Sequence, residues 1–300
     1  MRLKTILVVG AAMFSSGLLH ADFVVNGAFD VPVPSNGTGG GWTSSHIVDG
    51  GWRSANGNAI FVLNWNGALE VDPSIEQTLT GLVTGREYLI EGDYCNYHGL
   101  GWCNASALSF GVEVQSSVIL ELSYPGSCVQ LYPFAASFIA DATDQTIRFT
   151  AERNGSDCDY AIDNISVTAL AEVMTCSGFE PPMANHPVTV KKNRALPLKA
   201  EVFNADGFAL TDTDLTAAPV VQVWFDSGEG GDAIDVTDDV LSVGQGDEGN
   251  QFVFTEGDRW QFNLSTKNYT SPGTYTVLME TGDSSEYVLE PTCMTEFVIK

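Results

Sequence analysis

The sequence predicts an all-β protein made of antiparallel β-sandwiches. Three observations favour this fold class: short segments alternate apolar and polar residues, turn signals separate these segments, and no stretch shows helical periodicity. The turn signals include Asn-Gly or Gly-Gly pairs at residues 36–37, 40–41, 50–51, 56–57 and 66–67. Short alternating segments between frequent turns are typical of β-sandwiches.

Residues 1–21 have the features of an export signal. Arg2 and Lys4 give a positive start, residues 5–19 are mostly apolar, and Ala21 is a small residue suited to cleavage. A membrane anchor is the alternative, but the apolar stretch contains glycines and serines and is short for a span. We expect cleavage after Ala21, no membrane insertion of the mature chain, and a secreted or extracellular protein. Retention in the periplasm stays open as the second location.

The chain is strongly acidic, with 38 acidic residues against 13 basic ones and a formal net charge of −25. The charge is spread over both halves, so it does not form an acidic tail. Such a surface repels nucleic acid and anionic lipid, and we expect neither as a partner.

Six cysteines in an exported chain predict disulfides, and the spacing C-x-x-C of a metal site is absent. Cys176 and Cys293 bracket the second half of the chain, and we expect them to be joined. The pairing of the other four stays open, although Cys95 and Cys103 would close the shortest loop; these four are Cys95, Cys103, Cys128 and Cys158.

The first expected domain covers residues 22–170. Its predicted strands follow one another between the turn signals, at residues 26–30, 59–63, 74–79, 87–94, 107–114, 135–140, 145–149 and 159–167.

Two of these segments carry a resemblance to a known family. Asn-Gly-Ala-Phe-Asp at residues 26–30 opens the domain, and Ile-Asp-Asn-Ile-Ser-Val at residues 162–167 closes it. This pattern, with the order of the strands between, resembles the galactose-binding-domain-like jelly rolls, especially carbohydrate-binding modules of families 4 and 9. The resemblance implies a jelly-roll sandwich and a binding protein.

Asp30 and Asp163 are the candidate metal ligands. Each lies next to apolar residues in a terminal strand, where a buried carboxylate is costly unless it is paired or binds a cation. The resembling family often holds a structural calcium at this position, so we expect calcium between Asp30 and Asp163. The alternative is that each aspartate caps a turn or is solvated at a strand end.

Aromatic side chains are the candidate sugar-binding residues, because aromatic rings stack on pyranose rings. We expect this role from Trp52, Trp65, Tyr97 and Trp102, of which the last two lie between Cys95 and Cys103. Each could instead pack over a sheet edge. Trp42 lies where the family places a core tryptophan, so we expect it to be buried.

The second expected domain covers residues 171–300, after a short connector at residues 169–173. Gly-Phe-Glu-Pro-Pro at residues 178–182 and the run through Pro197 and Lys199 resemble the bacterial surface domains called PxKF domains, although Ala200 replaces their phenylalanine. The resemblance implies an accessory immunoglobulin-like sandwich. The acidic, Gly-rich residues 211–249 predict an irregular strand pair with a mobile loop.

No motif for catalysis is present. The mature chain has three histidines, His46, His98 and His186, and neither H-E-x-x-H nor G-x-S-x-G occurs. We therefore expect an exported, non-catalytic protein that recognises a polysaccharide or a cell-surface glycan. The alternative is a structural or adhesive scaffold without sugar binding. Sugar binding predicts that the candidate aromatic residues gather on one exposed face.

Overall fold

The computed structural model describes residues 22–48, 50–55, 58–63, 71–96, 109–123, 130–151, 159–184, 187–228, 232–240, 249–255, 257 and 259–299. Within these ranges the elements are 22 β-strands and one 3-10 helix, Thr237–Asp239. The predicted all-β class is therefore confirmed. No helix in these ranges is long and apolar enough to cross a membrane.

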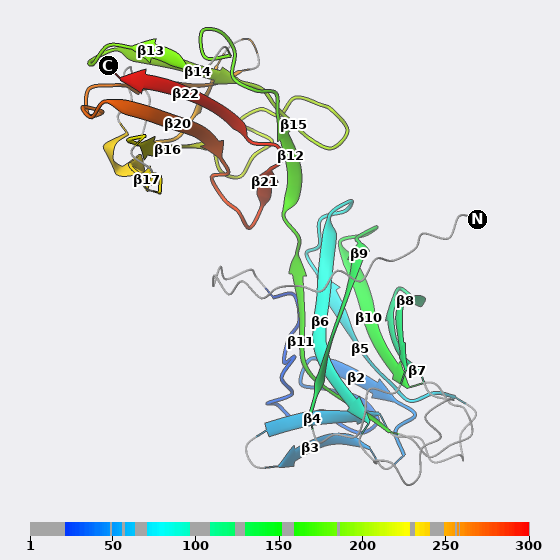
Figure 1. The fold of residues 1–300 in the computed structure, drawn as a ribbon. Helices are drawn as coiled ribbons and strands as arrows, with labels where there is room; N and C mark the ends of the chain where they lie inside the picture. Colours follow the sequence, from blue (N-terminus) through cyan, green and yellow to red (C-terminus); the bar gives the residue numbers. More distant parts are fainter. Residues whose placement is uncertain are drawn as a thin grey trace.

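Two sheets form the N-terminal part of the structure (Figure 1). The six-stranded sheet has the order β1 (Gly37–Gly39), β2 (Trp42–Ser45), β5 (Ser74–Thr80), β10 (Asp144–Ala151), β7 (Ser109–Val114) and β8 (Ser117–Ser123). The five-stranded sheet has the order β3 (Gly51–Ala55), β4 (Asn58–Leu63), β11 (Tyr160–Ala169), β6 (Glu87–Asn96) and β9 (Tyr132–Ile139). All neighbouring strands run antiparallel, as expected of a jelly-roll sandwich.

Large aromatic side chains fill the space between the two sheets. Trp42 is fully buried, as predicted, and its indole Nε1 donates to the carbonyl oxygen of Asn26 at 3.1 Å. Phe110 and Phe149 from neighbouring strands stack with their ring centroids 6.1 Å apart. Burying each such ring stabilises the fold by roughly 2–3 kcal/mol.

The N-terminal segment lies beside β11, so the two ends of this part meet. The amide of Phe23 donates to the carbonyl oxygen of Val167 at 3.0 Å, and the amide of Ile165 donates to Gly27 at 3.0 Å. Asp22 accepts hydrogen bonds from the amides of Val24 and Val167 through the same carboxylate oxygen. The mature chain expected after cleavage would thus begin at a residue that is fixed to the sheet.

The C-terminal part has its own core and three further sheets. The five-stranded sheet has the order β13 (Val188–Val190), β22 (Cys293–Ile299), β20 (Gly273–Glu280), β16 (Val220–Asp226) and β17 (Ile234–Asp235). One three-stranded sheet has the order β14 (Ala195–Ala200), β19 (Arg259–Ser265) and β18 (Val253–Thr255). The other has the order β15 (Val202–Phe203), β12 (Glu172–Cys176) and β21 (Tyr287–Leu289). The strand pair expected within residues 211–249 is β16 with β17.

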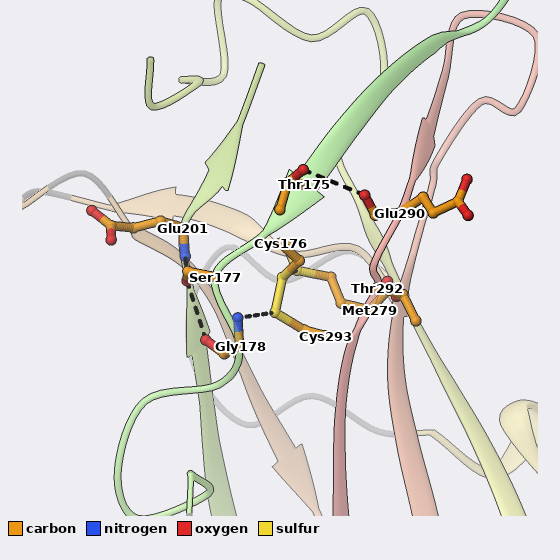
Figure 2. Close-up of a disulfide and its surroundings, with 9 residues drawn as sticks. All are labelled: Thr175, Cys176, Ser177, Gly178, Glu201, Met279, Glu290, Thr292 and Cys293. Atoms are coloured by element: carbon orange, nitrogen blue, oxygen red, sulfur yellow. Dashed lines mark hydrogen bonds between the residues drawn. A yellow bond between two sulfur atoms is a disulfide. The ribbon is translucent and has the colours of Figure 1, made fainter. Parts of the chain in front are cut away.

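A buried disulfide joins the first strand of this part to the last (Figure 2). Cys176 at the end of β12 is bonded to Cys293 at the start of β22, as predicted. The amide of Gly178 donates to the Cys293 sulfur at 3.0 Å. Cys95 is also disulfide-bonded, and the other three cysteines lie outside the described residues.

Arg86 links the two parts across the short connection between β11 and β12. Its guanidinium donates to Glu286 at 2.8 Å, to the carbonyl oxygen of Ser285 at 3.3 Å and to that of Leu170 at 3.4 Å. The Arg86 side chain is only 12% exposed, and the amide of Glu172 donates to the Glu286 carbonyl at 2.9 Å. Contacts from both sides therefore define the angle at the junction.

Candidate functional site

Of the four predicted sugar-binding residues, the structure describes only Trp52. This tryptophan lies in β3, is half-buried, and packs against the core. Its Nε1 donates to the carbonyl oxygen of Phe29 at 2.7 Å, which ties β3 to the N-terminal segment. Trp65, Tyr97 and Trp102 lie outside the described residues, so the predicted cluster stays a prediction.

The two predicted metal ligands belong to chain segments that lie side by side. The strand predicted at residues 26–30 is wrong: these residues form a turn, and Asp30 is exposed, whereas Asp163 in β11 is 1% exposed. Asp163 lies at a β-bulge, and its Oδ1 accepts a hydrogen bond from the amide of Asn164 at 2.8 Å. Asn164 adopts a φ of 53° and donates from Nδ2 to Asp93 at 2.8 Å.

A calcium ion prefers six to eight oxygen ligands. Among the described residues, no three acidic, histidine or cysteine side chains come together in a group that could hold a metal. The carbonyl of Phe29, next to Asp30, already accepts the Trp52 indole. Calcium at Asp30 and Asp163 would therefore depend on further backbone carbonyls, and it stays a prediction.

A different constellation lies on the outer face of the six-stranded sheet, which we call the polar face. Alternation along each strand places the apolar side chains in the core and leaves two polar rows outside. The strand registers align these rows across the sheet as Thr43, Glu76, Arg148, Glu113 and as Ser45, Ser74, Thr150, Gly111, Glu121.

Arg148 is the centre of the polar face. Its Nη2 donates to the hydroxyl of Ser74 at 3.1 Å, and that hydroxyl lies 2.9 Å from the hydroxyl of Ser45. The carboxylates of Glu113 and Glu76 lie 3.7 Å and 3.9 Å from the guanidinium, too far for direct hydrogen bonds. The buried Nε of Arg148 has no hydrogen-bond partner. This Nε is closed to solvent and lies 3.9 Å from Glu76, so a ligand hydroxyl would instead use Nη1 of the partly exposed side chain, which lies 3.7 Å from Glu113.

Beside Arg148 the polar face is hollowed. The hollow has a volume of about 220 Å³ and is lined by Asp72, Ser109, Gly111, Glu113, Val118, Glu121 and Thr150. A Cβ at Gly111 would lie 2.6 Å from Oγ1 of Thr150, so a larger residue would crowd the wall of the hollow. Carboxylates and hydroxyls surround this space, and both kinds of group hydrogen-bond to polyols.

Sequence reasoning missed this constellation, although part of its signal is visible in the sequence. Arg148 lies between the core residues Ile147 and Phe149, so strand alternation alone directs it outward. Its neighbours Glu76 and Glu113 are 72 and 35 positions away in the chain. They become neighbours only through the strand register, which the alternation does not specify.

Comparison with known proteins gives distant structural neighbours only. No family model and no curated protein matches the chain. The CBM22-1 xylan-binding domain from Paenibacillus barcinonensis matches with a TM-score of 0.35 and 11% identity, covering 51% of this chain and 97% of that domain.

Two further neighbours are modules of similar size. The N-terminal cellulose-binding domain of Cellulomonas fimi β-1,4-glucanase C has a TM-score of 0.33 and 13% identity, with 47% of this chain and 99% of that domain covered. A family 35 carbohydrate-binding module from Clostridium thermocellum has a TM-score of 0.30 and 16% identity, with 48% and 95% covered. Each of these three proteins matches only about half of the length of this chain.

Proposed function

We propose that this chain is an exported, non-catalytic binding protein whose N-terminal part recognises a polysaccharide or a cell-surface glycan. The observation that carries the proposal is the polar face, where the partly exposed guanidinium of Arg148 lies 3.7 Å from Glu113, which also lines the hollow together with Thr150. A sugar presents hydroxyl groups that both donate and accept, so it can bond the guanidinium and the carboxylates at once.

The sequence motifs at both ends of the N-terminal part also support this proposal. They resemble carbohydrate-binding modules, as set out above, and the leader supports export. In the same proposal, the C-terminal part is an accessory sandwich, and calcium at Asp30 and Asp163 stabilises the N-terminal part.

The charge of the N-terminal part indicates which glycans it takes. Residues 22–170 contain seventeen acidic residues, four arginines and no lysine. Arg86 is engaged at the junction, and Arg148 has a glutamate on each side. An acidic sugar would add negative charge to a part in which carboxylates greatly outnumber cations, so we propose neutral glycans as the ligand class.

Retention of the mature chain on insoluble neutral polysaccharides and on a glycan array tests the proposal. The variants are Arg148→Gln, Glu113→Gln and Thr150→Val. Loss of a hydrogen bond to a charged group costs roughly 1.5–3 kcal/mol, so the first two variants should bind about 10- to 100-fold more weakly. Thr80→Val, on the same sheet but outside the hollow, is the matched control and should bind like the unchanged chain.

The same experiment is run with calcium and with a chelator. If the chelator lowers the melting temperature, a calcium that stabilises the fold is supported whether or not glycan is retained. If no neutral glycan is retained in either condition, the sugar-binding proposal fails and the scaffold alternative replaces it.

A further inference from the structure

Four exposed cationic side chains lie at one end of the C-terminal part, and we call this group the basic tip. Lys191, Lys192 and Arg194 lie in the turn between β13 and β14, and Lys267 follows β19. All four side chains are exposed. In a chain with a formal net charge of −25, a local group of this kind requires a separate explanation.

The buried residue Thr266 holds the two loops of the basic tip together. Its hydroxyl accepts a hydrogen bond from the amide of Arg194 at 2.8 Å and donates to the carbonyl of Lys191 at 3.1 Å. The amide of Thr266 donates to the Arg194 carbonyl at 2.8 Å. Because Lys267 directly follows Thr266, the backbone fixes all four residues close to one another.

The cations of the basic tip differ from three of the arginines elsewhere in the described structure. Arg86, Arg148 and Arg259 each lie within 4 Å of a glutamate carboxylate: Arg86 is 2.8 Å from Glu286, Arg148 is 3.7 Å from Glu113, and Arg259 contacts both Glu180 and Glu201. Within the described ranges, none of the four basic-tip residues forms an ion pair. In the described structure these four charges lie on exposed side chains.

The basic tip lies far from the polar face. β13 runs parallel to β22 and pairs Val190 with Ile299, so the turn after β13 lies beside the C-terminal end of β22. Figure 1 shows this end of β22, marked C, on the side of the C-terminal part away from β12 and the junction. The two surfaces can thus contact different ligands at the same time.

We propose that the basic tip is a second binding site and that it takes an anionic polysaccharide. The three lysines on exposed turns are flexible point charges, and the arginine adds a planar donor group; together they suit a polymer with charges repeated along its chain. Neither described loop exposes an aromatic side chain for stacking on bases or a large apolar side chain for insertion into lipid. A thin polymer needs only a narrow contact with the tip, whereas an extended anionic membrane would also face the acidic residues around it, such as Asp239, whose carbonyl accepts from Asn268.

The test measures binding of the mature chain to immobilised heparin as the anionic polysaccharide, over a series of salt concentrations. Binding should weaken steeply with salt, and Lys191→Gln/Lys192→Gln should reduce the slope of log affinity against log salt by about two. Lys199→Gln, a half-buried lysine in β14 outside the tip, is the control and should leave the slope unchanged.

The proposal is overturned if the double variant binds heparin like the unchanged chain. It is also overturned if phosphatidylglycerol vesicles or single-stranded DNA bind as tightly as heparin, or if the chain associates with itself through the tip when heparin is absent. Binding to neutral glycans should be unchanged in the double variant. The two proposals are therefore tested separately: neutral-glycan retention tests the polar face, and heparin binding tests the basic tip.

Discussion

Gly27 shows how a single residue controls the closure of the N-terminal part. A Cβ at this position would lie 1.8 Å from the carbonyl oxygen of Ile165, a distance that no side chain tolerates. The same glycine accepts the hydrogen bond from the Ile165 amide at 3.0 Å. The Asn-Gly pair at residues 26–27 therefore allows the N-terminal segment to lie directly against β11.

We expect Gly27→Ala to destabilise the N-terminal part by about 2 kcal/mol or more, because the segment must move away from β11. Urea unfolding of the mature chain measures this change. Gly81→Ala is the control: its φ is 79° but its Cβ would meet no atom within 4 Å, so only backbone strain of about 1 kcal/mol applies. Equal losses in the two variants would contradict the close approach at Gly27.

Glu280 provides a pH-dependent prediction. This residue ends β20, and burial raises the pKa of its carboxyl above the ordinary value. Below the ordinary pKa the carboxyl is protonated in folded and unfolded chains, and its charge has no effect. As the pH rises past the raised pKa, the folded chain carries a poorly solvated charge and stability is lost.

Glu280→Gln should therefore raise the unfolding free energy at about pH 7, by less than about 1 kcal/mol, and have no effect at about pH 3. Urea midpoints at the two pH values measure the difference. Asp212→Asn, on an exposed loop, removes the same charge and is the control. A gain that is equal at both pH values would exclude burial of the charge as the cause.

At the scale of single elements, the disulfide Cys176–Cys293 closes the C-terminal part. It joins β12 to β22 across a sequence separation of 117 residues. A cross-link over so long a loop removes much of the conformational freedom of the unfolded chain. Its stabilising effect should therefore be confined to the C-terminal part.

We expect Cys176→Ala/Cys293→Ala to lower the unfolding free energy of the C-terminal part by about 4 kcal/mol. Differential scanning calorimetry of the mature chain, with a separate transition for each part, measures this loss. The transition of the N-terminal part is the internal control and should not move. A shift of that transition would show that the disulfide acts beyond its own part.

Strands were predictable from the sequence where apolar and polar residues alternate clearly. Residues 74–79 and 87–94 match β5 and β6 closely, because their alternation marks one buried and one outer face. β8 was not predicted: its valine, isoleucine and leucines are exposed or half-buried at a sheet edge, so they do not mark a buried face. The ring of groups around Arg148 was also not predicted, because strand register is a long-range property.

At the scale of the whole molecule, Arg86 determines how the two parts are held. Only Leu170 and Ala171 separate β11 from β12, and the guanidinium of Arg86 bonds the carbonyl of Leu170 as well as the loop with Glu286. A short connection together with these bonds should keep the junction in a single arrangement.

We expect Arg86→Ala to loosen the junction without unfolding either part. Small-angle scattering should give a broader distribution of distances, and limited proteolysis at residues 170–171 should be several-fold faster. Arg86→Lys keeps the charge but not the planar group that reaches three acceptors. Its distance distribution and its proteolysis rate should therefore lie between those of the unchanged chain and those of Arg86→Ala. Unchanged scattering in Arg86→Ala would show that the connection alone holds the junction.

The position of the disulfide also determines how the protein responds to a pulling force. If a glycan holds the N-terminal part and tension acts on the C-terminus, the force passes from β12 through Cys176–Cys293 directly into β22. The residues between the two cysteines carry none of this load, so the C-terminal part cannot be unravelled while the bond is intact. Reduction would release on the order of 400 Å of chain under force. The disulfide therefore makes the C-terminal part an inextensible link between its two ends.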